Sequence, residues 1–181
     1  MGPFGHCAVG MAAKRMAPQV PLGVLLLATE ILDIFAIAFV YAGIEGGAAS
    51  GNAWSHGLLM SVVWSLVAAL LVSRMYLSYR AGLVVGLLVF SHWALDFISH
   101  PIPFPSFSWR TWQWSYGHPL PSDLPLLFGG SPKVGLGLYN SISAAEATAL
   151  ELGMFLVGTA VYVTYSVKEK KNKAPANAKM L

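Results

Sequence analysis

Charged residues are scarce in this chain, and cysteine is almost absent. Asp, Glu, Lys and Arg together make up 10% of the 181 residues, whereas hydrophobic residues make up 56%. Such a composition is too apolar for an ordinary soluble domain of this length and favours a membrane protein. The single cysteine, Cys7, excludes an intramolecular disulfide and any CxxC metal clip.

Motifs of several soluble protein classes are also missing. The sequence has no glycine-rich phosphate loop, no nucleophile elbow and no internal repeat. Its basic residues lie at the ends of apolar runs and form no patch with interleaved aromatic residues. We therefore expect no nucleic-acid partner, and we interpret the basic residues as signals of membrane topology.

Four apolar runs are each long enough to cross a bilayer, which needs roughly 20 residues. They cover about 20–42, 55–77, 80–99 and 142–166. The preceding stretch, Pro3–Met16, is too short to span at about 14 residues and suits an interfacial or re-entrant helix. The sequence thus predicts an all-α membrane protein with a single transmembrane domain over residues 1–167.

The basic residues are distributed very unevenly between the two sides of this predicted bundle. If the N-terminus is cytoplasmic, only Arg110 and Lys133 lie outside, and the other nine of the eleven Lys and Arg residues lie inside. This bias follows the positive-inside rule, so we expect a multi-pass protein of the cell membrane with both termini in the cytoplasm. The basic tail, residues 168–181, is expected to be disordered, with a weak signal for anionic lipid.

The stretch from Pro101 to Ser141 is a long outer loop rich in proline and aromatic residues. Its seven prolines exclude a continuous helix, and its tryptophans favour the headgroup layer of the membrane. Loops of this length are more often functional than merely connecting. Two interpretations stay open: an outer cap that shapes access to a site, and an aromatic anchor without a ligand.

Several ionisable residues fall inside the predicted spans at similar depth. His92 and Asp96 are four residues apart and share one helix face. Counting along the helices places Asp33, His56, His92, Asp96 and Glu151 at about 18–27 Å above the cytoplasmic ends. Burying one such group costs at least ~2.5 kcal/mol. Their convergence on one layer therefore predicts a single polar site inside the bundle.

Asp33 has no Lys or Arg at its depth in any predicted helix, so a metal ion, a proton or a water-filled cavity must compensate its charge. His56, His92, Asp96 and Asp33 together offer two imidazoles and two carboxylates from three helices. This donor set suits zinc or manganese with an open position for water. A metal ion would lower the pKa of that water toward neutrality and supply a nucleophile.

Further residues are candidates for supporting roles. Glu45 and Glu151 are free carboxylates near the predicted site and are candidates for the general base. His100 lies about 80° around the helix from His92 at ~100° per residue. It is a candidate for supporting a metal ligand from outside the coordination sphere, with solvation at the membrane surface as the alternative.

An ordered set of short motifs resembles a family of small prokaryotic membrane proteins. These motifs are Gly5-His6 with Lys14-Arg15, Ala28–Phe35 with Asp33, Gly43-Ile44-Glu45, Ser55-His56, Ser91-His92 through Asp96, and Gly135–Ser141. The chain resembles the LexA-regulated inner-membrane metal-dependent hydrolases and their uncharacterised relatives. The family's usual Pro-Asp is Leu32-Asp33 here, and its His-Ser is His56-Gly57, which spares the proposed ligands. The resemblance implies an inner-membrane location and adds His6 to the metal site.

Three functions compete on this evidence. The leading hypothesis is a metal-dependent hydrolase that acts on a lipid-like or membrane-associated ester, with membrane lipid as its surroundings. The second is a non-enzymatic accessory subunit in which the polar cluster only fixes helix packing. The third is a proton or cation transporter, which would require a homo-oligomer because four helices are few for alternating access.

Overall fold

The computed structural model describes residues 2–44, 54–99, 102–103, 133–134 and 138–177. In chain order the helices are α1 (Pro3–Ala13), α2 (Leu22–Tyr41), α3 (Leu58–Tyr76), α4 (Tyr79–Ser99) and α6 (Ala144–Asn177). A 3-10 turn, η1 (Leu138–Ser141), precedes α6. The short strands β1 (Ile102–Pro103) and β2 (Lys133–Val134) pair antiparallel, with Ile102 opposite Val134. The rest of the outer loop lies outside the described residues.

Four helices are long and apolar enough to cross a membrane, as the sequence predicted. They are α2, α3, α4 and the Ala144–Asn172 part of α6. Apolar side chains on their outward faces, such as Leu66 of α3 and Leu156 of α6, are largely exposed. Exposed leucines of this kind are expected where helices contact lipid. The described chain is therefore all-helical apart from the two-residue pairing, as expected of a multi-pass membrane protein.

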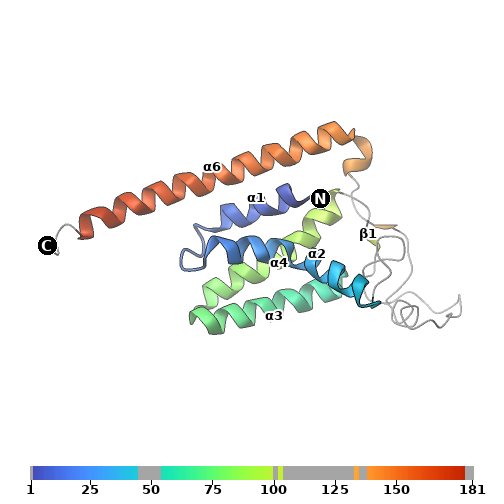
Figure 1. Cartoon of the computed structure of the whole chain (residues 1–181), viewed down its shortest axis with the longest axis horizontal. Coiled ribbons are helices and arrows are strands. Elements are labelled where there is room, and N and C mark those ends of the chain that lie inside the picture. Colours follow the sequence, from blue (N-terminus) through green and yellow to red (C-terminus); the bar gives the residue numbers. More distant parts are fainter. Residues whose placement is uncertain (1, 45–53, 100–101, 104–132, 135–137, 178–181) are drawn as a thin grey trace, which may run out of the picture.

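The short helix α1 lies between α6 on one side and α2 and α4 on the other (Figure 1). Small residues permit this close packing. A Cβ added at Gly158 of α6 would lie 2.6 Å from the carbonyl oxygen of Ala8, and one at Gly10 would lie 3.2 Å from that of Leu25. As a result, His6 in the first turns of α1 is completely buried among the longer helices.

Helices α3 and α4 form a tight antiparallel hairpin. Leu77, which ends α3, adopts a left-handed conformation (φ 47°) and turns the chain back. A Cβ added at Gly86 of α4 would lie 2.9 Å from the carbonyl oxygen of Ser65, and one at Gly82 would overlap the carbonyl oxygen of Ala69. Glycines one turn apart thus let the two backbones approach each other, as small residues do at membrane helix interfaces.

A Gly82→Ala substitution is expected to destabilise the protein because its new methyl group meets backbone atoms that cannot move aside. Overpacking of this kind costs about 1–3 kcal/mol. Gly23 of α2 is the matched control, since nothing lies within 4 Å of a Cβ built there. Gly23→Ala should be neutral or stabilising by up to about 1 kcal/mol. Thermal unfolding in mild detergent measures both variants, and equal melting temperatures would contradict the close packing.

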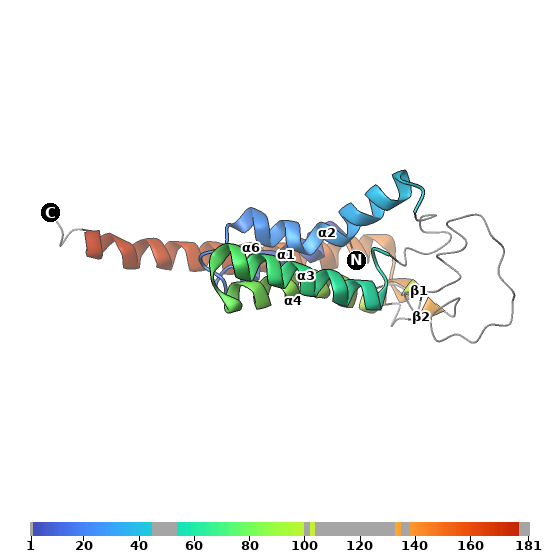
Figure 2. The same cartoon turned by 90° about the horizontal axis from the view of Figure 1, so that it is seen from below.

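The C-terminal segment differs from its prediction. The sequence predicted disorder from Lys168 onward, but α6 continues as a helix to Asn177 and extends beyond the other helices (Figures 1 and 2). Lys and Glu are good helix formers, and extending an existing helix requires no new nucleation. Residues 178–181 lie outside the described residues.

Candidate metal centre

Four segments that are distant in sequence bring the five predicted ligands together. His6 comes from α1, Asp33 from α2, His56 from the turn before α3, and His92 and Asp96 from α4. The ligand atoms form two groups, His6 with His92 and Asp96, and Asp33 with His56 and His92. Within each group the atoms lie within 4.8 Å of one another. The predicted convergence of these residues is therefore present in the structure.

Local contacts hold the turn that carries His56 against α3. The indole Nε1 of Trp64 donates a hydrogen bond to the carbonyl oxygen of Trp54 at 2.8 Å. Next to His56, the buried Ser55 hydroxyl lies 3.0 Å from the histidine Nδ1. These contacts leave Nε2 of His56 directed at the other ligand atoms.

Nε2 of His56 is the atom around which the other ligand atoms gather. It lies 3.0 Å from Asp33 Oδ1, 3.1 Å from His92 Nε2 and 3.8 Å from Asp96 Oδ2. Nε2 of His92 in turn lies 3.5 Å from Asp33 Oδ1 and 3.4 Å from Asp96 Oδ2. Two ligands bound at ~2.1 Å to a tetrahedral ion are about 3.4 Å apart. The five separations are close to this ligand–ligand distance, and the two groups of ligand atoms share His92.

A contact of the His92 Nδ1 atom shows which ring nitrogen carries a proton. Nδ1 lies 2.6 Å from the carbonyl oxygen of Thr29, which can only accept a hydrogen bond, so Nδ1 carries the proton. In the neutral ring Nε2 then presents a lone pair toward the carboxylates of Asp33 and Asp96. A histidine that donates Nδ1–H to a carbonyl group while Nε2 faces other ligands is the usual arrangement at a metal site.

His6 joins the cluster through Asp96 and through its own ring. Its Nε2 lies 3.4 Å from Asp96 Oδ1, whereas the other oxygen of Asp96 faces His92. The rings of His6 and His92 are stacked, with centroids 3.9 Å apart and planes 8° apart. His6, which only the family resemblance implied, therefore lies next to His92 and Asp96.

Most side chains of the cluster are buried, and that of Asp33 is the most exposed. The side chains of His6 and His92 are 0% and 1% exposed, and that of Asp96 is also buried. The side chain of Asp33 is 48% exposed. A water molecule or a substrate would therefore reach the cluster most directly past Asp33.

Glu151, a candidate for the general base, is engaged elsewhere. Its buried Oε1 accepts hydrogen bonds from the backbone N–H of Gly2 at 2.6 Å and from the Tyr139 hydroxyl at 2.9 Å. Burial and the Glu151 carboxylate together raise the pKa of Tyr139 to about 12. Glu151 belongs to neither group of metal-ligand atoms and instead links η1, the start of α1 and α6. The other two candidates, Glu45 and His100, lie outside the described residues.

Sequence reasoning missed the groups that orient the ligands. The Thr29 carbonyl oxygen is a backbone atom, so no residue type reveals it. The contact of the Ser55 hydroxyl with the His56 ring could have been predicted, because the two residues are adjacent in the sequence.

Comparison with known proteins adds no assignment to this geometry. No protein-family model matches the chain, and no curated protein or solved structure is similar enough to match it. What indicates a metal centre is the set of positions of His6, Asp33, His56, His92 and Asp96.

Proposed function

We propose that this chain is an integral membrane metalloprotein that binds a divalent cation between Asp33, His56, His92 and Asp96. One observation carries the proposal: imidazole nitrogens and carboxylate oxygens from α2, α4 and the turn before α3 lie 3.0–3.8 Å from one another. The carboxylates and the deprotonated nitrogens of neutral imidazoles repel one another, and a bound cation would offset this repulsion. Two imidazoles and two carboxylates suit zinc or manganese.

We further propose that the protein is a hydrolase. A bound divalent cation lowers the pKa of a coordinated water and so supplies a nucleophile near neutral pH. That water would take a coordination position beyond the four protein ligands, on the side of the half-exposed Asp33, where a substrate would also enter. Glu45 follows α2 closely in sequence and stays the candidate for the general base, because Glu151 is engaged with Gly2 and Tyr139.

The surroundings of the cluster favour a lipid-like ester as the substrate. The ligands come from helices long and apolar enough to cross a membrane and from the segments packed against them. A substrate reaching such a site benefits from an apolar portion that partitions into the bilayer, with the reactive ester at the polar cluster.

Elemental analysis of the full chain, purified in mild detergent without chelator, is the direct test of the metal centre. We expect a stoichiometric amount of zinc or manganese, because the donor set matches these ions. Hydrolysis of a fluorogenic lipid ester should be lost on chelation and restored by the same metal. Protein that contains no stoichiometric divalent cation would refute the metal centre, and metal-loaded protein without esterase activity would refute the hydrolase assignment alone.

A further inference from the structure

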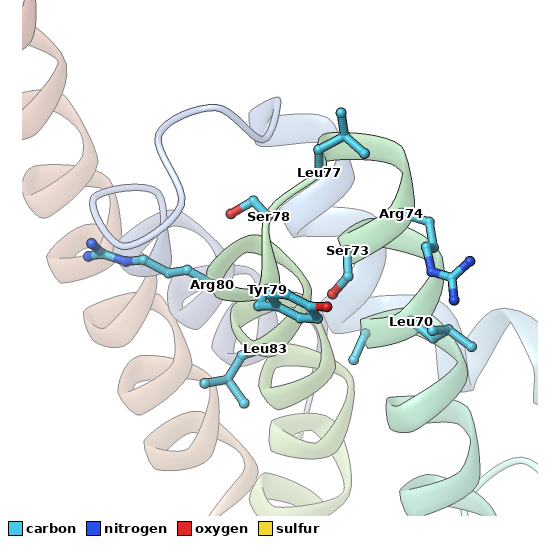
Figure 3. Close-up of a pocket in the computed structure, with 9 residues that line it drawn as sticks. Leu70, Ser73, Arg74, Leu77, Ser78, Tyr79, Arg80 and Leu83 are labelled. Carbon is cyan, nitrogen blue, oxygen red and sulfur yellow. The ribbon is translucent and has the colours of Figure 1, made fainter.

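A cavity of about 730 Å³ opens between the end of α3 and the start of α4, at the turn that joins them. Its lining includes two arginines, Arg74 and Arg80, and the hydroxyl side chains of Ser73, Ser78 and Tyr79. Figure 3 shows the arginines on opposite flanks of the turn, with their guanidinium groups directed away from each other and the two serines between them. The cavity is separate from the metal cluster: His92 lies roughly 20 Å further along α4 than Tyr79, at ~1.5 Å per residue.

The cavity is positively charged. Its lining residues, all within the described part of the chain, include no Asp or Glu. Neither Arg74 nor Arg80 forms an ion pair with a carboxylate of the described residues. Guanidinium groups bind phosphate oxygens in a fork of two parallel hydrogen bonds, so this charge suits a phosphate ester.

The same cavity has an apolar wall at the depth where lipid is expected. Leu70 of α3 and Leu83 of α4 line it and are largely exposed. At the turn itself Leu77 is 92% exposed and Tyr79 is 91% exposed. Because α3 and α4 are long and apolar enough to cross a membrane, their shared end falls at the boundary between headgroups and acyl chains.

We propose that the cavity at the α3–α4 turn binds an anionic phospholipid. The exposed side chains of Arg74 and Arg80 turn inward from the two flanks to contact the headgroup phosphate, and Leu70 and Leu83 lie along the acyl chains. Free phosphate offers the arginines the same kind of oxygen but leaves the leucine wall uncovered, so the combination of basic rim and apolar wall favours the lipid. Basic pockets between membrane helices recognise anionic headgroups in this way.

The test uses the full chain, delipidated in neutral detergent, and native mass spectrometry to count bound lipid. The probes are short-chain phosphatidylglycerol, short-chain phosphatidylcholine and inorganic phosphate. We expect phosphatidylglycerol to bind best and not to be displaced by inorganic phosphate. Arg74→Gln and Arg80→Gln should each weaken phosphatidylglycerol binding about fivefold, and the double variant about 30-fold. Equal binding of the two lipids, or displacement by inorganic phosphate, would overturn the proposal.

Lys170→Gln/Lys171→Gln is the matched control, because it removes two exposed positive charges of α6 that do not line the cavity. Its phosphatidylglycerol affinity should equal that of the wild type; a loss as large as that of the arginine double variant would assign binding to general surface charge and overturn the proposal. Metal content reports separately whether the variants keep the distant cluster. If the double variant does not fold, Leu83→Trp fills the cavity from its wall and should lower lipid binding, whereas unchanged binding would overturn the proposal.

Discussion

A His92→Ala variant is expected to bind its divalent cation at least about 100-fold more weakly than the wild type. Losing a group that only hydrogen-bonds to a metal ligand already lowers metal affinity by up to about 100-fold, and this variant loses a ligand itself. His92 contributes to both groups of ligand atoms, and its Nδ1 is fixed by the Thr29 carbonyl oxygen. Alanine removes the ligand atom and leaves a neighbouring ring, that of His6, without its stacking partner. Elemental analysis after dialysis should therefore find no stoichiometric metal.

Glu146→Gln is the control for this loss. Glu146 is an exposed carboxylate that caps its own helix through Ser143, away from the cluster. This variant should retain the full metal content. A His92→Ala protein that keeps its metal would show that the cation binds elsewhere, and the proposed centre would then be wrong.

The second large effect is that chelation should reverse the order of stability of the wild type and Asp96→Asn. Thermal unfolding of both proteins measures it. With metal bound, the wild type should be more stable, by about 4 kcal/mol when the free cation is at 1,000 times its dissociation constant. With chelator present, at a pH where the imidazoles are neutral, the wild type keeps two carboxylates close to deprotonated ring nitrogens, whereas Asp96→Asn removes one of those charges. The variant should then match or exceed the wild type.

This comparison separates a metal centre from a cluster that only fixes helix packing. If Asp96 served as a purely structural partner of the histidines, removing its charge would destabilise the protein by about 3–5 kcal/mol whether or not chelator is present. An unchanged order of melting temperatures in the two conditions would therefore favour the accessory-subunit hypothesis. Glu146→Gln should respond to chelator as the wild type does.

Much of the fold was predictable because a helix that crosses the hydrocarbon core of a membrane needs a run of about 20 predominantly apolar residues. Helix α4 was expected at residues 80–99 and is found at Tyr79–Ser99, and α2 was expected at 20–42 and is found at Leu22–Tyr41. The hydropathy of each run determines where such a helix starts and ends. The Lys and Glu residues that follow the apolar run of α6 are not hydrophobic, so hydropathy did not predict that the helix continues to Asn177.

For the candidate site, the sequence predicts how far along its helix each side chain lies, but not which neighbouring helix the side chain faces. Counting residues gives the height of a side chain along a helix, and on that basis Glu151 was grouped with His92. In the structure the Glu151 carboxylate accepts hydrogen bonds from Gly2 and Tyr139. Packing between helices determines how α6 is rotated about its axis, and counting residues along a helix gives no information on that rotation. His6 had no independent signal for the same reason, since its burial depends on small residues such as Gly10 and Gly158 in contacts between helices.

The spacing of the ligands along the chain, from residue 6 to residue 96, has a consequence for biosynthesis. During translation the ribosome delivers α1 and α2 first, when only His6 and Asp33 are in place. The coordination set is complete only after α4 has entered the bilayer and folded back on α3. We therefore expect the proposed cation to be loaded only after the hairpin has been inserted, and until then Asp33 has neither the cation nor His92 beside it.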